Sequence, residues 1–296
     1  MSMVQDLSSR AACRVVGGVY DLTAGGFPAV VRIETTNACN ARCTICPHQR
    51  MTRPVSTMDE GLFRRIVDEC AARGCAEIHL HNFGEPLLDR RLEDRIHYAK
   101  ARGIAKTKLF SNGSLLTEAR ARRLVEAGLD EIKISFDGAS REEFEAIRVP
   151  LKFDRIVENI ARLVVIRNAA GSKLAILVAC CSTSDKTATM QTLERIVDGF
   201  SFGRVHNWGG DEFAGKPQGV RKTCSRLWRT FTVLSDGRVA LCCLDYDGKH
   251  VLGRIGPNST IREAWTGAAY ARVRSLHREA RQDEIPLCSR CTKSFF

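Results

Sequence analysis

The sequence predicts an α/β protein in which a partial (β/α)6 barrel precedes a small C-terminal α+β domain. The first observation is that strand-like and helix-like segments alternate six times between residues 29 and 208. Repeated βα units form a parallel sheet with right-handed crossovers, and six units are too few for a closed eight-stranded barrel. The second observation is a series of polar turns after successive strands, and the third is a separate group of cysteines beyond residue 223.

Periodicity, capping residues and glycine stops place each element of the barrel. Helices are expected at 59–73, 91–102, 117–127, 153–169 and 186–197. Strands are expected at 29–33, 76–81, 105–110, 131–136, 174–180 and 204–208. In the C-terminal part, strands at 229–234 and 238–243 flank a Ser-Asp-Gly turn, and a helix at 261–278 follows. The predicted domains are an N-terminal extension (1–28), the barrel (29–208), a linker (209–223) and the C-terminal domain (224–296).

Composition narrows the classes of partner. The net charge of +11 comes mostly from scattered arginine, and only 7% of residues are aromatic, so a nucleic-acid partner is not expected. An anionic substrate or a partner protein is left open. Neither a secretion signal nor an apolar run of the roughly 18 residues that a membrane span needs is evident. We therefore expect a cytoplasmic protein without a membrane partner, in which thirteen cysteines favour metal ligation over disulfides.

Cys39, Cys43 and Cys46 are spaced C-x3-C-x2-C and directly follow the first expected strand. Such a loop could place three sulfurs around one corner of an iron–sulfur cube, which usually takes four thiolates. One iron would then stay open for a substrate or cofactor. A zinc site is the main alternative, although zinc usually takes paired C-x2-C motifs.

A second group of cysteines lies in the C-terminal domain. Four of its five thiols could hold one cluster, and spacing alone leaves an iron–sulfur cluster and a structural zinc site equally open. Its members are Cys224, Cys242, Cys243, Cys288 and Cys291. Five further cysteines show no partner spacing and are interpreted as packing residues, namely Cys13, Cys70, Cys75, Cys180 and Cys181.

The first cysteine motif resembles the hallmark C-x3-C-x-Φ-C of the radical S-adenosylmethionine (SAM) superfamily, and the resemblance extends to about residue 208. It implies that Cys39, Cys43 and Cys46 hold a [4Fe–4S] cluster whose open iron binds SAM. An external one-electron donor of the flavodoxin or ferredoxin type would then allow cleavage of SAM to a 5′-deoxyadenosyl radical. The turn 83–86 resembles the family's GGEP turn, with Phe83 in place of one glycine. The implied contacts to SAM are Ile45, Gly84, Glu85, Asn112 and Ser135.

The second group is similar to the twitch domain, the short form of the SPASM extension. That resemblance implies an auxiliary [4Fe–4S] cluster with four protein ligands, which are Cys224, Cys242, Cys288 and Cys291. A cluster with four protein ligands serves electron transfer or the fold. Cys243 is left over, either as a packing residue or as a hydrogen-atom donor.

The pattern resembles in particular superfamily members that act on aminocyclitols and aminoglycosides, such as neomycin C epimerase. The reaction favoured here is epimerisation of an aminoglycoside or aminocyclitol carbon in antibiotic biosynthesis, with Cys243 returning a hydrogen atom. The alternative is dehydrogenation of a secondary alcohol through the auxiliary cluster, and peptide modification is less favoured. Asp211 and Glu212 are candidates for binding substrate ammonium groups, and Trp208 is a candidate for stacking on a sugar.

Overall fold

The computed structural model describes residues 3–209 and 220–294. The described strands are β1 (Val30–Ile33), β2 (Glu77–His79), β3 (Lys106–Ser111), β4 (Glu131–Ser135), β5 (Ala175–Cys180), β6 (Gly199–Phe202), β7 (Thr230–Val233), β8 (Arg238–Ala240) and β9 (Val251–Arg254). The described α-helices are α1 (Met3–Thr23), α2 (Glu60–Ala72), α3 (Leu92–Ala101), α4 (Glu118–Glu126), α5 (Arg141–Ile147), α6 (Phe153–Ala169), α7 (Lys186–Gln191), α8 (Arg226–Arg229), α9 (Ile261–Thr266), α10 (Ala268–Arg278) and α11 (Pro286–Ser289). Short 3₁₀ turns are η1 (Pro47–Arg50), η2 (Pro86–Leu88), η3 (Gln282–Glu284) and η4 (Thr292–Ser294).

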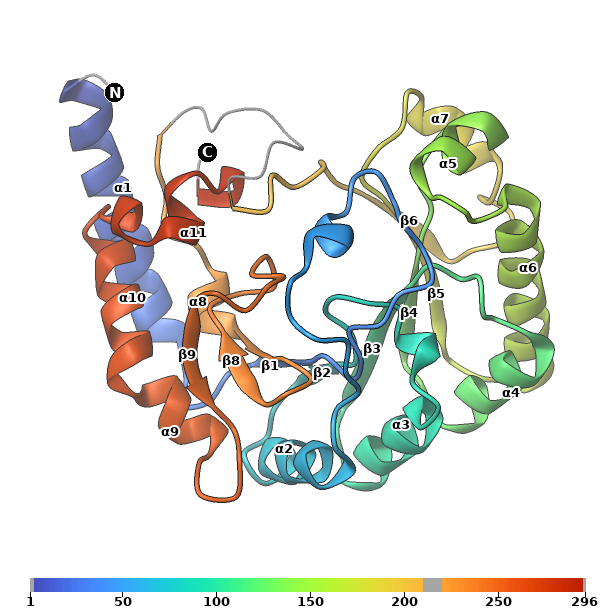
Figure 1. The fold of residues 1–296 in the computed structure, drawn as a ribbon, viewed down its shortest axis with the longest axis horizontal. Helices are drawn as coiled ribbons and strands as arrows, with labels where there is room; N and C mark the ends of the chain where they lie inside the picture. The colour runs from blue at the N-terminus through green and yellow to red at the C-terminus, as the bar shows by residue number, and fades with distance from the viewer. Residues whose placement is uncertain (1–2, 210–219, 295–296) are drawn as a thin grey trace.

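All nine strands form one sheet in the order β6-β5-β4-β3-β2-β1-β7-β8-β9. The sheet curves into a horseshoe, helices α2 to α6 line its outer face, and the loop that follows β1 lies inside it (Figure 1). Strands β1 to β6 are parallel, which confirms the predicted α/β partial barrel. The concave face of this barrel therefore surrounds the loop that carries the first cysteine motif.

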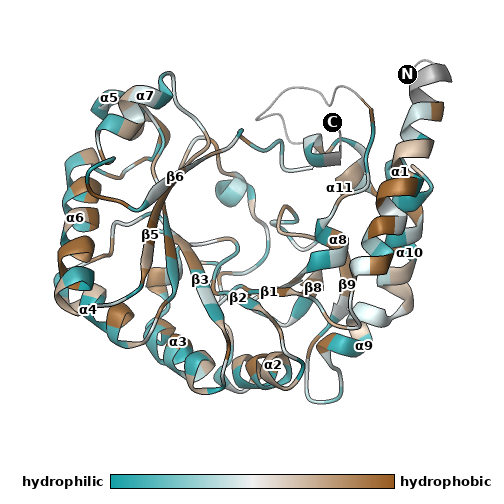
Figure 2. Cartoon of the chain, turned by 180° about the vertical axis from the view of Figure 1, so that it is seen from behind, coloured by the Kyte–Doolittle hydropathy of each residue, from teal (hydrophilic) through white to brown (hydrophobic). Residues whose placement is uncertain are grey.

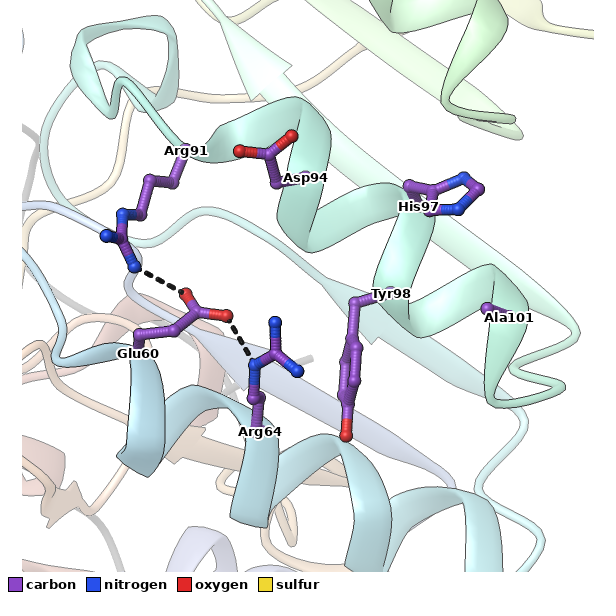
Figure 3. A pocket seen from close by; sticks show the side chains of 7 residues that line it. All are labelled: Glu60, Arg64, Arg91, Asp94, His97, Tyr98 and Ala101. Carbon is purple, nitrogen blue, oxygen red and sulfur yellow. Dashed lines mark hydrogen bonds and ion pairs between the residues drawn. The ribbon is translucent and has the colours of Figure 1, made fainter.

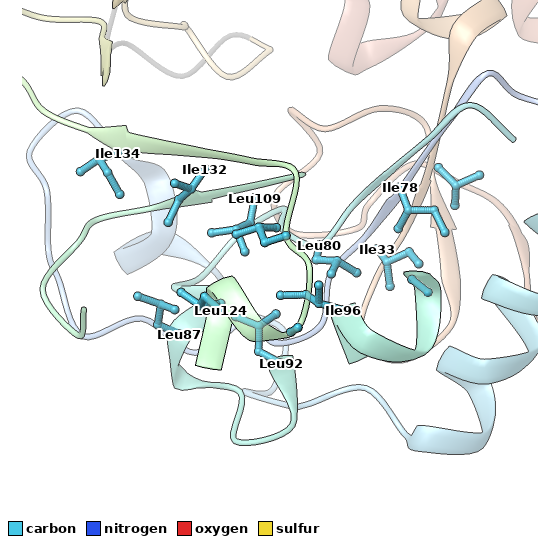
Figure 4. Packing of buried hydrophobic residues seen from close by; sticks show 14 of the residues in the cluster. Ile33, Ile78, Leu80, Leu87, Leu92, Ile96, Leu109, Leu124, Ile132 and Ile134 are labelled. Carbon is cyan, nitrogen blue, oxygen red and sulfur yellow. The ribbon is translucent and has the colours of Figure 1, made fainter. Parts of the chain in front are cut away.

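Alternation along the strands decides what faces the helices. In β4 the side chains of Ile132 and Ile134 are fully buried against the outer helices. Leu109 of β3 and Ile78 of β2 are likewise buried, and they belong to the same hydrophobic core as Ile96 of α3 (Figure 4). Seen from behind, β5 is strongly hydrophobic (Figure 2), as expected of a strand covered on its outer face. The apolar face builds the core, so the other face is left for polar side chains.

Several elements differ from the sequence prediction, among them the helix expected at 186–197, which ends at Gln191. The strand expected at 204–208 is wrong, because β6 lies earlier, where Phe200 and Phe202 pair with the outward-facing residues Val178 and Cys180 of β5. The helix expected at 261–278 is interrupted at Gly267, where a Cβ would lie 2.8 Å from a backbone oxygen of the preceding turn. The strand expected at 238–243 ends at residue 240.

The C-terminal hairpin continues the barrel sheet instead of forming a sheet of its own. Strand β7 pairs in parallel with β1, so that Thr232 lies beside Arg32, and β8 then returns antiparallel to β7. The N-terminal helix α1 packs on this part of the molecule, where Asp21 accepts hydrogen bonds from Trp228 at 2.8 Å and from Arg278 at 2.7 Å. The two cysteine-bearing parts of the chain therefore share one continuous framework.

A buried ion pair fastens the loop after the first cysteine motif to the hairpin. Both guanidinium ends of Arg53 donate to the Glu34 carboxylate, at 2.5 and 2.6 Å, and Glu34 is fully buried. Ser235 at the hairpin turn donates to the same carboxylate through its backbone N–H, at 3.1 Å. Asp247 of the hairpin's following loop accepts from the Thr52 backbone at 2.6 Å. These contacts join segments about 200 residues apart in the chain.

Replacing Arg53 with methionine is expected to destabilise the protein by about 3–5 kcal/mol, because it leaves the buried Glu34 charge without its partner. Urea denaturation followed by circular dichroism measures this change. The exchange Arg65→Met on the outer face of α2 is the control and should change the free energy of unfolding little. If Arg53→Met lowers the free energy of unfolding by less than about 1 kcal/mol, the ion pair does not stabilise the contact between this loop and the hairpin.

Candidate active site

The first cysteine loop is held against the barrel by backbone hydrogen bonds. The Arg42 N–H donates to the Val149 carbonyl at 2.6 Å, and the Thr44 N–H donates to the Ile147 carbonyl at 2.9 Å. This anchoring at the end of α5 fixes the loop between β1 and the far side of the barrel. Cys43 is buried, and Cys39 and Cys46 are partly buried.

The three thiols of this loop lie within electrostatic reach of one another. Burial raises the pKa of Cys39 to about 12, and the neighbouring Cys43 and Cys46 add to the rise. Burial likewise raises the pKa of Cys46 to about 11, with Cys43 contributing. The thiols of Cys39 and Cys46, whose pKa values are raised in this way, need a positively charged partner to become thiolates. An iron cluster supplies that charge.

Backbone amides are placed to bind sulfur at both cysteine groups. The N–H two residues further along donates to Cys39 and to Cys46 in the first group, and to Cys224 and Cys242 in the second. The Leu244 N–H, for example, lies 3.4 Å from Cys242 Sγ. Hydrogen bonds to ligand sulfurs stabilise thiolates and tune cluster potentials. The donor set therefore fits iron–sulfur clusters.

Arg148 is a contact of this loop that the sequence prediction missed. Its guanidinium lies 3.7 Å from Cys43 Sγ and pairs with the buried carboxylate of Asp137. Asp137 also accepts the backbone N–H groups of Cys181 and Ser182, at 2.6 and 2.7 Å. Asp137 follows two residues after Ser135, a predicted contact to SAM, but an arginine at the end of α5 gave no comparable signal. Arg148 thus joins the ends of β4 and β5 to the cysteine loop.

Gly84 and Glu85 connect the second strand end to the cysteine loop. Gly84 has a φ of +93°, and a Cβ there would lie 2.6 Å from the Ala38 carbonyl oxygen, so only glycine fits. The Glu85 carboxylate accepts from the Ser111 hydroxyl at 2.7 Å and from the Asn112 N–H at 2.7 Å. Burial raises the pKa of Glu85. In this structure the carboxylate holds two strand ends together, and its contact with SAM stays a prediction.

Asn112 and Ile45 are tied to the same loop from other sides. The Asn112 side-chain amide donates to Asn40 Oδ1 at 2.9 Å. The Ile45 carbonyl accepts from the Trp208 indole N–H at 3.1 Å, and Phe83 contacts that indole at a centroid distance of 5.4 Å. Trp208, which the sequence suggested as a stacking residue for a sugar, is therefore engaged with the cysteine loop. Ser135 ends β4 on the concave face, and the candidates Asp211 and Glu212 lie outside the described residues.

The structure brings together the four predicted ligands of the second group. Cys288 is buried, and its pKa is raised first by burial and then by Cys242, Cys224 and Cys291. The Cys291 N–H donates to the Cys288 carbonyl at 3.2 Å, which closes the C-terminal turn. No three His, Cys, Asp or Glu side chains within residues 3–209 and 220–294 converge on a single ion-sized point. A cube does not need such convergence, because each thiolate binds a different iron.

Cys243 lies beside two arginines. Burial would raise its pKa, but Arg226 and Arg32 lower it below the usual value, and Arg32 is within hydrogen-bonding reach of the thiol. Cys242 and Cys243 lie beyond β8, which ends at Ala240, so strand alternation does not decide which way the two thiols face. The two thiols nevertheless have different surroundings, since Arg32 belongs to β1 of the barrel.

His79 on the concave face allows a test of pH dependence. Burial, followed by the charge of Arg32, lowers its pKa to about 4. The neutral form is favoured in the folded state, so unfolding takes up a proton below the unfolded pKa of about 6.5. The free energy of unfolding should therefore fall by up to about 2 kcal/mol between pH 7 and pH 5 through this group.

The variant His79→Gln should lose that part of the acid sensitivity, measured by urea denaturation at both pH values. The exchange His97→Gln, at an exposed position of α3, should retain it. Equal slopes for His79→Gln and the wild type would contradict a buried neutral histidine.

A hollow of about 460 Å³ lies between α2 and α3 on the outer helical layer (Figure 3). Arg64 donates to Glu60 at 2.8 Å, and Arg91 lies 3.8 Å from the same carboxylate. The sheet separates this hollow from the cysteine loop, so we assign it no part in the chemistry (Figure 1). No helix in the described ranges is long and apolar enough to cross a membrane.

The fold and the two cysteine groups define a class of protein. Residues 33–168 match the Radical SAM superfamily, and residues 224–292 match SPASM, an iron–sulfur cluster-binding domain. The matched residues form a radical SAM domain, which is followed in the chain by a SPASM domain. These matches confirm SAM and iron–sulfur clusters as the cofactors predicted from the sequence.

Individual relatives are similar over different lengths. The S-adenosyl-L-methionine-dependent 2-deoxy-scyllo-inosamine dehydrogenase of Niallia circulans is 22% identical over 89% of this chain and 92% of that protein. The GTP 3′,8-cyclase of Chlorobaculum tepidum is 34% identical, but over only 45% of this chain and 40% of the cyclase.

Solved structures show the same fold. BtrN in complex with AdoMet and 2-DOIA has a TM-score of 0.65 at 21% identity, covering 89% of this chain and 92% of that one. SuiB of Streptococcus suis bound to the precursor peptide SuiA has a TM-score of 0.69 at 12% identity, and the match covers 88% of this chain and 70% of SuiB.

Proposed function

We propose that this protein oxidises a secondary alcohol of a small polyhydroxylated ring, of the class to which aminocyclitols belong. The full-length similarity to a SAM-dependent dehydrogenase of an aminocyclitol supports this reaction better than the epimerisation that the sequence analysis favoured. The proposal rests on one observation. A second site with four neighbouring cysteines is joined to the first cysteine loop through one continuous sheet. A dehydrogenase needs such a site as an electron acceptor.

Oxidation of an alcohol to a ketone removes one hydrogen atom, one electron and one proton, and the two predicted cluster sites can account for the first two. Once bound, SAM and a cluster at the first cysteine loop would supply the radical that removes one hydrogen atom from the carbinol carbon, and a cluster at the second group of cysteines would take up one electron. The hydroxyl proton leaves to solvent, and a ketone remains. The chain contributes the positions of these parts. Arg148 and the Ile45 carbonyl fix the first loop, and the Glu34–Arg53 pair keeps the two sites in one arrangement.

Deuterium at the carbinol carbon tests the reaction. Reconstituted, reduced protein is given SAM and either 2-deoxy-scyllo-inosamine or myo-inositol 1-phosphate, each deuterated at its alcohol carbons. At least one of the two should form a ketone and monodeuterated 5′-deoxyadenosine in equal amounts. The variant Cys43→Ala is the control and should form neither. Transfer of deuterium without a ketone would contradict dehydrogenation. A flavodoxin- or ferredoxin-type protein is the proposed reductant and replaces dithionite in a parallel assay.

Epimerisation stays a second candidate because Cys243 lies against Arg32, a barrel residue, and not only among the second group of thiols. In that reaction, turnover in D2O should give an inverted product labelled at one carbon. Cys243→Ala should then still transfer hydrogen to 5′-deoxyadenosine but should give little inverted product. Normal ketone formation by Cys243→Ala supports dehydrogenation and excludes the thiol as a required donor.

A further inference from the structure

The concave face of the barrel carries a group of charged side chains that the proposed chemistry does not use. The strand register places Arg32 beside His79, His79 beside Lys108, and Lys108 beside Glu131. Lys133 follows two residues after Glu131 and so faces the same side of β4. Their neighbours in the strands are buried against the helices, so this ladder of polar side chains faces the barrel interior.

Positive charge exceeds negative charge in this ladder. The single carboxylate of Glu131 is shared by three lysines, Lys106 at 2.7 Å, Lys108 at 2.6 Å and Lys133 at 3.9 Å. Lys133 is therefore the most weakly paired of the three. Its ammonium otherwise lies 5.7 Å from the centre of the Phe110 ring, and its side chain is only 18% exposed. Burial, followed by the charge of Lys108, lowers the pKa of Lys133, and an anion beside its ammonium would offset both effects.

Hydrogen-bonding atoms in the same interior lack partners. Arg32 Nε, His79 Nδ1 and His81 Nδ1 are buried and make no hydrogen bond to the described residues. The Thr232 hydroxyl, beside Arg32 in the sheet, also makes no hydrogen bond to the described residues, and Thr232 is only 1% exposed. An unsatisfied buried polar atom costs about 1–3 kcal/mol. These atoms together form a polar interior that a bound group can satisfy.

The histidines do not add to the positive charge. Burial and Arg32 lower the pKa of His79 to about 4 and that of His81 well below its usual value. Four cations then stand against the carboxylates of Glu77 and Glu131, and Glu77 accepts from His79 Nε2 at 2.8 Å. The excess of positive charge repels a cationic substrate and attracts an anionic one.

We propose that the barrel interior binds an anionic group of the substrate, a carboxylate or a phosphate, with Lys133 as its charged partner. Lys133 stands on the concave face of β4, two residues before Ser135, and Arg32, which reaches Cys243, stands three strands away on β1. The inference rests on the proposed function for the presence of a small substrate in the barrel. It adds that the hydroxylated ring carries a negative charge, where the substrate named for the Niallia dehydrogenase carries an amine.

Binding of inorganic phosphate and of acetate to the reconstituted protein with SAM, measured by calorimetry, tests the site directly. Lys133→Gln should weaken binding of at least one anion by 10-fold or more. Lys133→Arg, which keeps the positive charge, should bind that anion like the wild type. Lys152→Gln, whose side chain is 70% exposed, is the matched control and should bind like the wild type. Iron content and circular dichroism establish that the variants fold. Absence of binding, or equal binding by Lys133→Gln, overturns the inference.

A panel of ring alcohols separates this inference from the proposed reaction. Glucuronate, myo-inositol 1-phosphate and 2-deoxy-scyllo-inosamine represent the carboxylate, phosphate and amine classes, and formation of 5′-deoxyadenosine and ketone is measured for each. Turnover of an anionic member that Lys133→Gln loses supports the site and identifies its group. Turnover of the amine alone overturns the anion site and retains the dehydrogenase. Anion binding that depends on Lys133, with no ketone from any member, retains the site and overturns the dehydrogenase.

Discussion

The exchange Cys43→Ala is expected to remove about four iron atoms per chain and to abolish formation of 5′-deoxyadenosine, because two thiols do not hold an open cube. Cys43 is the best placed of the three for this test, since its sulfur is buried and accepts from Arg148. Its alanine variant removes a ligand and one contact of Arg148, which keeps its ion pair with Asp137. The second group of cysteines should keep its iron.

The control for this variant is Cys70→Ala, which removes another fully buried thiol from α2 without touching either cysteine group. Iron and sulfide are counted after anaerobic reconstitution, and 5′-deoxyadenosine is measured by chromatography. Full iron content in Cys43→Ala, with SAM cleavage at the rate of the wild type, would show that this loop does not hold the cluster.

The double variant Cys288→Ala with Cys291→Ala is expected to separate SAM cleavage from product formation. It should lose about four irons but retain the first cluster, so 5′-deoxyadenosine should still form slowly. Ketone formation should fall by about 100-fold or more, equivalent to about 2.7 kcal/mol in the barrier, since the electron has lost its acceptor. Unchanged ketone formation would mean that the second site only supports the fold.

Folding of this variant needs its own control because α11 and the hairpin pack in a small apolar cluster with Leu227 and Trp228. Thermal unfolding of the double variant and of Ser289→Ala, on the same turn, gives the comparison. If the double variant unfolds as a whole while Ser289→Ala does not, the double variant should also lose the iron of its first cluster. Retention of the first cluster shows that the barrel is intact.

Local patterns explain what the sequence predicted well. The spacing of Cys39, Cys43 and Cys46 and the turns at Gly84 and Gly113 are set within a few residues, and all of them lie at strand ends of the observed sheet. Non-local contacts explain what it missed. The residues around Glu34 in the chain do not indicate that it pairs with Arg53. The sequence of the hairpin likewise does not indicate that β7 pairs with β1.

The misplaced sixth strand has a related cause. Residues 204–208 precede the linker and include aromatic side chains, but the edge of β5 was already paired by Phe200 and Phe202. The charged ladder could have been read from alternation, since Lys106, Lys108 and Lys133 occupy every second position of strands β3 and β4. Alternation alone does not show that this polar face lines a barrel interior, because lysines in a strand ordinarily face solvent.

The most direct test of the account is the release of 5′-deoxyadenosine by the reconstituted, dithionite-reduced protein supplied with SAM alone. We expect its formation to depend on reductant and to be accompanied by an iron content of about eight atoms per chain. Protein that holds this iron and still leaves SAM intact under reducing conditions would contradict an open iron at the loop of Cys39, Cys43 and Cys46, and with it the proposed radical chemistry.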